Sequence, residues 1–366
     1  MAPSLSLSPS PSLAVARNNA PLRTPDDVRA LLAAFDLDLA SVLTTANPKL
    51  AKTQGAHSVI HHALPHRALA RAIDPETVAT TAPRGFLPTL RALAETRGMV
   101  NDAMAHNGCR FATQGCIAAC LNGAGHGGIS TACAHCRGRR TLAMIADPVT
   151  YQRAVLWALA RAYADAARHG LPLAWRMLGT DETPWHRMHA PLFPHETAIL
   201  RRRFGIDAVD GNALTLAGML APMIADGRMI PYEYVKADVD HPDGPAAWLR
   251  AGWRDITASF AADRLTACAD AVAALRAGFR VAVPIAWSKD APLPRWCTLA
   301  TRAGQSITVH TVDGDADDAR WRNPAGCVVL LREKRARGAD RTLADRFILP
   351  HARLHPLADG TVSLDG

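Results

Sequence analysis

Five of the eight cysteines in this 366-residue chain lie close together in the sequence. They are Cys109, Cys116, Cys120, Cys133 and Cys136. Thiolates are soft ligands for zinc and for iron–sulfur clusters, and clustered thiols in a reducing compartment indicate metal binding rather than disulfides. A single free cysteine is more often a buried residue. We therefore expect Cys268 and Cys327, which lie on apolar runs, to be core residues, while the sequence leaves Cys297 undecided.

Two kinds of metal centre fit the spacing of the clustered cysteines. In the first, Cys116, Cys120, Cys133 and Cys136 form a C-x3-C and C-x2-C set that binds zinc tetrahedrally. In the second, Cys109, Cys116 and Cys120 bind three irons of a [4Fe-4S] cluster, and the fourth iron stays open or takes another cysteine. Spacing alone slightly favours zinc.

The segments around the cysteines differ in composition. Residues 1–22 contain Ser, Pro, Ala and Leu with almost no charge, which predicts a disordered tail. We expect a helical segment over 23–108, with one helix capped by Thr24 before Pro25 and another at 87–96. Residues 109–140 are rich in glycine, so we predict a metal-binding loop with little regular structure. Asp147 and Pro148 begin a long amphipathic helix that ends near Gly170.

Short apolar or β-branched runs then predict a sheet. They cover residues 173–178, 230–235, 255–260, 280–287, 306–312 and 327–331. Leu265, Cys268, Val272 and Leu275 share one face of a helix that ends before Gly278, and strand–helix–strand units favour parallel pairing. We predict an α/β fold over 141–345, an incomplete or irregular (β/α) barrel, with an open α/β sheet as the alternative. Residues 109–345 would form one structural unit, followed by a C-terminal tail at 346–366.

Several polar residues follow or lie on these predicted strands. Gly179, Thr180, Asp181 and Glu182 follow the strand at 173–178, where parallel α/β folds bind ligands. Tyr232, Tyr234 and Lys236 alternate along one strand, so they share a face and could line a cavity. Asp313, Asp315, Asp317 and Asp318 form an acidic turn with Arg320 close behind. Such a turn could bind a hard cation, although a solvated loop is more common.

The net charge is +8 and the isoelectric point is about 9.3, which permits contact with nucleic acid without requiring it. Arg201, Arg202 and Arg203, and the group Lys334, Arg335 and Arg337, are candidate phosphate contacts. No apolar run is long enough for a membrane span, and we expect a cytoplasmic protein.

Several motifs in order resemble the gene product 88 domain of phage and plasmid proteins, over roughly residues 45–335. They are Asn47-Pro48-Lys49-Leu50-Ala51-Lys52-Thr53; Cys109, Cys116 and Cys120 with Leu121-Asn122; Arg176, Gly179, Thr180, Asp181 and Trp185; Tyr232, Tyr234 and Lys236; Thr257 and Ser259; and Asp313, Gly314, Asp315, Asp318 and Arg320. The family has no firmly assigned reaction.

The three-cysteine loop of this family is similar to that of radical SAM enzymes, although the spacing here is C-x6-C-x3-C instead of C-x3-C-x2-C. The resemblance implies a [4Fe-4S] enzyme of radical-SAM-like architecture that uses S-adenosylmethionine, with residues 179–182 beside the cofactor. Its substrate cavity would include Arg176, Trp185, Tyr232, Tyr234, Lys236, Ser259, Asp313, Asp315 and Arg320. The alternative is a non-catalytic, zinc-stabilised protein of a mobile element that binds nucleic acid. The oligomeric state stays open.

Overall fold

The computed structural model describes residues 24–45, 50, 53, 55–74, 87–123, 130–288, 290–334 and 340–349, and the backbone of 354–356 and 361–365. The predicted tail at 1–22, most of the 47–53 motif, Arg335 and Arg337 lie outside the described residues. No helix of the described chain is both long and apolar enough to cross a membrane.

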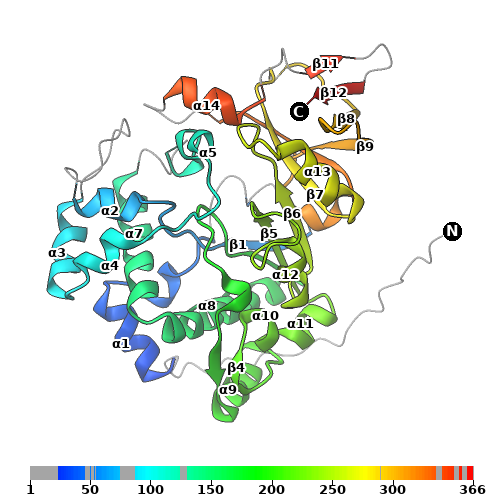
Figure 1. The fold of residues 1–366 in the computed structure, drawn as a ribbon. Helices are drawn as coiled ribbons and strands as arrows, with labels where there is room; N and C mark the ends of the chain where they lie inside the picture. The colour runs from blue at the N-terminus through cyan, green and yellow to red at the C-terminus, as the bar shows by residue number, and fades with distance from the viewer. Residues whose placement is uncertain are drawn as a thin grey trace.

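A ten-stranded, largely parallel sheet organises the described chain (Figure 1). Its order is β1 (His57–Ile60), β2 (Leu173–Arg176), β5 (Met229–Val235), β6 (Asp255–Ser259), β7 (Arg280–Ile285), β10 (Val328–Arg332), β9 (Ser306–Asp313), β8 (Trp296–Ala300), β12 (Thr361–Asp365) and β11 (Leu354–Pro356). Every neighbouring pair from β1 to β9 is parallel, whereas β8 pairs with β9, and β11 with β12, in antiparallel fashion. β1 and β11 are the edges, so the described strands form no closed barrel. A small separate sheet joins β3 (Ala190–Leu192) to β4 (Gly211–Leu214).

Helices surround this sheet, and most of the N-terminal ones gather beyond its β1 edge (Figure 1). They are α1 (Asp26–Ala34), α2 (Ala68–Ile73), α3 (Pro88–Thr96), α4 (Val100–Ala105), α5 (Gln114–Ala118), α7 (Thr131–Ala146), α8 (Pro148–Arg168), α9 (Pro194–Phe204), α10 (Leu216–Met219), α11 (Ala221–Ala225), α12 (Pro245–Arg250), α13 (Ala267–Arg276) and α14 (Arg341–Phe347). Short 3-10 turns are η1 (Leu39–Ser41), η3 (Leu121–Gly123), η4 (Trp185–Arg187) and η5 (Arg320–Arg322).

The long helix α8 begins as the sequence predicts. The Asp147 side chain accepts a hydrogen bond from the backbone N–H of Thr150 at 2.9 Å, and Pro148 occupies the first turn. α8 then packs against β1 and β2 with Tyr151, Val155 and Leu159 fully buried. This apolar stripe anchors the N-terminal half of the sheet.

The two faces of the sheet differ in character because successive side chains of a strand point to opposite sides. On the face covered by α8, α11, α12 and α13, residues such as Trp175, Ile256 and Val283 join the main hydrophobic core. On the opposite face, Ala174 and Ala282 belong to two small apolar clusters. Smaller and more polar side chains on that face leave room for a cavity.

Most predicted elements are confirmed with small shifts at their ends. All six predicted strands exist, and α13 lies between the parallel strands β6 and β7. Cys268 and Cys327 are buried, as expected of core residues, and Cys297 is buried as well.

Four expectations about local structure are wrong. Thr24 does not cap α1, whose N-cap position is Pro25 and lacks a side-chain hydrogen bond. Leu265 lies before α13 and is 87% exposed, so it is not part of that helix's apolar face. Residues 131–140 belong to α7 instead of a loop, because Ser130 caps that helix and Gly138 inside it leaves space for Leu90. The C-terminal segment is not merely a tail, since β12 pairs with β8 in the main sheet.

Candidate functional site

A cavity of about 190 Å³ lies at the carboxyl ends of the parallel strands. Its lining includes side chains from the strands β2, β5, β6, β7 and β10 and from the residue directly after β5. These residues are Arg176, Tyr234, Lys236, Ser259, Pro284 and Arg332. The cavity exceeds the roughly 150 Å³ that accommodates a benzene molecule in a protein core. Ligands of parallel α/β proteins bind at this end of the strands.

Two of the clustered cysteines line this cavity, and a third lies behind its wall. Cys116 in α5 and Cys120, two residues after the end of α5, line the cavity. Cys109 is 5% exposed and does not line it, but its thiol donates to the carbonyl oxygen of Thr180 at 3.8 Å, and Thr180 does line it. None of the three forms a disulfide.

The segment that carries Cys116 is held by an aspartate that the sequence analysis did not single out. Asp263 follows β6, and its Oδ1 accepts from the hydroxyl of Thr113 at 2.7 Å. Its Oδ2 accepts from the backbone N–H of Gly115 at 2.8 Å. A Cβ on Gly115 would lie 2.7 Å from Asp263 Oδ2 and 2.7 Å from Phe347 Cβ, so glycine allows this close approach. No local sequence signal links residue 263 to the cysteines.

A second residue after β6 ties the cysteine segment to β5. One nitrogen of Arg264 donates to the carbonyl oxygen of Lys236 and another to that of Phe111, each at 3.1 Å. Arg264 and Asp263 together fix the position of the loop between Cys109 and Cys116 relative to the strand ends.

Lys236 is the cation that faces the three thiols. Burial raises the pKa of Cys109 and of Cys120, and it raises the pKa of Cys116 to about 11, whereas Lys236 lowers the pKa of all three. Burial lowers the pKa of Lys236, but Cys116, Glu182 and the other two thiols outweigh this effect and leave its pKa well above the ordinary value. An ammonium in this position favours the thiolate form, which is the form that binds metals.

Glu182 supports the site instead of facing the cavity. Its Oε1 lies 3.3 Å from Lys236 Nζ, and its Oε2 accepts from the backbone N–H of Phe111 at 3.0 Å. Its own N–H donates to the carbonyl oxygen of Gly108 at 2.6 Å. Glu182 thus connects the Cys109 segment to Lys236 and does not line the main cavity.

The other residues of the turn after β2 do line it. Gly179 is required by a close approach, because a Cβ there would lie 2.3 Å from the carbonyl oxygen of His61. The Thr180 hydroxyl donates to the carbonyl oxygen of Ala63 at 2.6 Å. Asp181 Oδ2 accepts from Thr183, while Asp181 Oδ1 is buried without a hydrogen-bond partner among the described residues. Burial raises the pKa of Asp181 to about 6.

Cys133 and Cys136 lie on the first turns of α7. The thiol of Cys136 donates to the carbonyl oxygen of Ser41 at 3.7 Å, and it borders a separate hollow with Ser41 and His135. Within the described ranges, no group of three or more His, Cys, Asp or Glu residues is arranged to hold a metal ion. The four-cysteine zinc set stays a prediction: Cys116 and Cys120 line the main cavity, Cys136 lines the separate hollow, and Cys133 lines neither.

Five of the predicted cavity residues do not line the cavity: Trp185, Tyr232, Asp313, Asp315 and Arg320. Trp185 is fully buried against His61, with ring centroids 5.3 Å apart, and Tyr232 is fully buried beneath Trp321. Asp313 and Asp315 belong to the acidic turn and contact Arg332 and Lys334, which do line the cavity.

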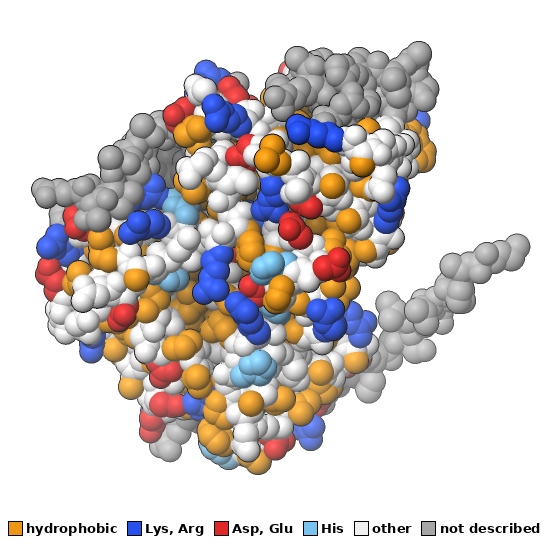
Figure 2. All heavy atoms as spheres, viewed as in Figure 1, with side chains coloured by type: hydrophobic (Ala, Val, Ile, Leu, Met, Phe, Trp, Pro, Cys, Tyr) orange, Lys and Arg blue, Asp and Glu red, His pale blue; other side chains and the backbone are white. Residues whose placement is uncertain are grey.

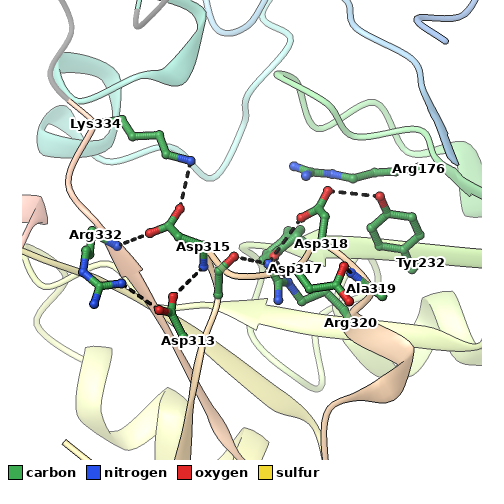
Figure 3. Close-up of polar contacts among 12 residues, drawn as sticks. Arg176, Tyr232, Asp313, Asp315, Asp317, Asp318, Ala319, Arg320, Arg332 and Lys334 are labelled. Carbon is green, nitrogen blue, oxygen red and sulfur yellow. Dashed lines mark hydrogen bonds and ion pairs between the residues drawn. The ribbon is translucent and has the colours of Figure 1, made fainter. Parts of the chain in front are cut away.

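Figure 3 shows how the acidic turn is neutralised. Asp313 pairs with Arg332 at 2.8 Å, and Asp315 pairs with Lys334 at 3.0 Å. Asp318 accepts from Tyr232 at 3.2 Å and pairs with the buried Arg320 at 3.3 Å. Arg320 also donates to the hydroxyl of Tyr234, so it supports a cavity wall from behind without lining it.

The predicted basic contacts are partly paired as well. Arg201 in α9 lies 3.1 Å from Asp207. Figure 2 shows Lys and Arg interspersed with Asp, Glu and apolar side chains on the face that it presents. Mixed charge of this kind is typical of an ordinary solvated surface.

No protein-family model, curated protein or solved structure matches this chain.

Proposed function

We propose that this chain is an iron–sulfur enzyme of radical-SAM-like architecture in which Cys109, Cys116 and Cys120 bind the cluster. One observation carries the proposal: Cys116 and Cys120 line a cavity at the carboxyl ends of parallel strands, and the thiol of Cys109 contacts Thr180 in the wall of the same cavity. The protein would then be an enzyme that acts on a substrate bound in this cavity.

The strand order supports a barrel-like core. The strands β1, β2, β5, β6, β7 and β10 lie side by side in chain order and are parallel throughout. A doubly wound sheet would instead reverse its order at a switch point. In a (β/α) barrel the parallel strands also follow one another in chain order, so we regard this part of the sheet as an incomplete barrel.

The donor set suits an iron–sulfur cluster better than a single zinc ion. All three ligands are soft thiols, and Lys236 favours their ionised form. A structural zinc site is closed by four ligands, whereas three thiolates leave one iron of a [4Fe-4S] cluster open. A four-iron cluster holds its thiolates farther apart. When bound with one open iron, it would supply single-electron reduction of S-adenosylmethionine.

The residues after β2 would bind that cofactor. Asp181 lines the cavity, so its carboxylate would accept from the amino group of the cofactor. Gly179 and Thr180 form the adjoining wall. Glu182 would act indirectly, by positioning Lys236 beside the thiols.

The resemblance to the gene product 88 domain is consistent with this assignment and adds the proposal of a phage or plasmid origin. We also propose a cytoplasmic location, since thiol ligands must stay reduced.

The test is metal and acid-labile sulfide analysis, with a visible spectrum, on protein purified without oxygen. The variant is Cys109→Ala, and the matched control is Cys133→Ala, which alters a cysteine of α7 outside the proposed ligand set. We expect iron and sulfide in the wild type, their loss in Cys109→Ala and their retention in Cys133→Ala.

One zinc per chain that is lost in Cys133→Ala but retained in Cys109→Ala would refute the proposal. It would instead favour the zinc-stabilised alternative, and the next measurement would be the salt dependence of nucleic-acid binding.

A further inference from the structure

The main cavity contains a buried arginine that the proposed cluster and cofactor do not use. Arg176 ends β2, is 9% exposed and lines the cavity. Its Nε donates to the carbonyl oxygen of Leu178 at 3.0 Å, and its guanidinium carbon lies 4.5 Å from the centre of the Tyr234 ring. These contacts fix the plane of the guanidinium group and leave its two terminal nitrogens for another partner.

Arg176 differs from the other cations of the cavity in its surroundings. Lys236, Arg332 and Lys334 are paired with Glu182, Asp313 and Asp315, respectively. In the part of the chain that the structure describes, no carboxylate forms a salt bridge with Arg176. The carboxylate of Asp318, which Figure 3 draws together with Arg176, accepts from Tyr232 and pairs with Arg320.

The buried carboxyl group of Glu233 interacts electrostatically with Arg176, but its two oxygens accept from the backbone N–H groups of Met177 and Leu178, and burial raises its pKa to about 8. A buried cation whose acidic neighbour is mainly protonated lacks a charged partner, which is energetically costly. A planar guanidinium presents a fork of donors that matches the two oxygens of a carboxylate or phosphate. The stacking on Tyr234 holds this fork in place before any ligand arrives, which reduces the entropy lost on binding.

We propose that Arg176 is the binding site for an oxyanion of the substrate, so that the substrate of this enzyme carries a carboxylate or a phosphate group. The cavity charge agrees with this assignment. Its lining has four cationic side chains, Arg176, Lys236, Arg332 and Lys334, and two acidic ones, Asp181 and Glu333. The oxyanion site at Arg176 is independent of the proposed function. Only the assignment of this anion to a substrate, as distinct from the cofactor, rests on it.

The test is calorimetric titration of the anaerobically purified protein with inorganic phosphate and, separately, with malonate. Iron and sulfide are measured on the same samples, so loss of the cluster and loss of the anion site are distinguished. We expect saturable binding of at least one probe by the wild type and a reduction of at least about tenfold in Arg176→Gln. Tighter phosphate binding would indicate a phosphorylated substrate, and tighter malonate binding a carboxylic acid.

Two further variants separate anion binding from folding. Arg140→Gln is the matched control, because Arg140 is 5% exposed and donates to the carbonyl oxygens of Ser41 and His62 outside the cavity. Its binding should equal that of the wild type. Ser259→Leu fills the cavity while leaving Arg176 in place, and it should also lose binding.

The proposal is overturned if neither probe binds saturably, or if Arg176→Gln binds as tightly as the wild type. Saturation with S-adenosylmethionine provides the remaining discrimination. If it abolishes phosphate and malonate binding, Arg176 serves the cofactor carboxylate, and the assignment to the substrate is wrong.

Discussion

Replacing Asp263 should loosen the cysteine segment, because this carboxylate joins it to the end of β6. Asp263→Ala removes an acceptor from the Thr113 hydroxyl at 2.7 Å and from the Gly115 N–H at 2.8 Å. A hydrogen bond to a charged group contributes about 1.5–3 kcal/mol. Asp263 is partly exposed, so water replaces some of this loss. We expect the free energy of unfolding to fall by about 2–3 kcal/mol in Asp263→Ala.

Asp263→Asn should lose roughly half as much, because its amide oxygen accepts one of the two bonds and the Thr113 hydroxyl can rotate to accept from its amide nitrogen. Equilibrium unfolding in urea gives both values, with the exposed Asp210→Ala as the control. Hydrogen exchange at the Gly115 amide provides a local readout. An Asp263→Ala variant within about 0.5 kcal/mol of the wild type would refute the reasoning, since that is the range of ordinary surface substitutions.

Two further variants test the neighbouring strand ends. Gly179→Ala places a Cβ 2.3 Å from the carbonyl oxygen of His61, so we expect the free energy of unfolding to fall by about 1–3 kcal/mol in thermal or urea unfolding. The control is Gly218→Ala, whose added Cβ would lie 3.2 Å from its nearest atom. Equal stability of the two variants would contradict the clash. Burial raises the pKa of Glu233 from 4.5 to about 8, so the folded chain keeps a proton that the unfolded chain has lost, and stability should fall as pH rises through this window. Glu233→Gln should remove this pH dependence. The raised pKa of Glu233 would be refuted if the difference in unfolding free energy between the wild type and Glu233→Gln stayed constant from pH 5 to about 8.5.

The sequence alone located the elements whose signals are local. The apolar, β-branched runs predicted β2, β5, β6, β7, β9 and β10, and Asp147 with Pro148 predicted the start of α8. These predictions hold because capping and alternating hydrophobicity act within a few residues. β1, β8, β11 and β12 were missed, since their pairing depends on partners supplied by distant parts of the chain.

Residue type also identified the chemistry of the site but not the role of each member. Cys109, Cys116 and Cys120 were singled out from their clustering, and the structure places Cys116 and Cys120 in the cavity and Cys109 against Thr180 in its wall. Glu182 was expected beside the cofactor, yet its carboxylate binds Lys236 and the backbone of Phe111. A carboxylate next to a strand end can point into the cavity or toward the neighbouring chain, and its hydrogen-bond donors are set by residues distant in the sequence.

The tertiary structure alone decided which residues support the cysteines and which one meets a ligand. Asp263 lies 150 positions after Thr113 in the chain, and among the described residues Arg176 forms no salt bridge although Asp318 lies on a neighbouring segment and pairs with Arg320. Local sequence sets the propensity of each segment, and so it determined the strands and the soft ligand set. Burial and charge pairing arise between segments that the fold brings together, and so these properties of Asp263 and Arg176 emerged only from the folded chain.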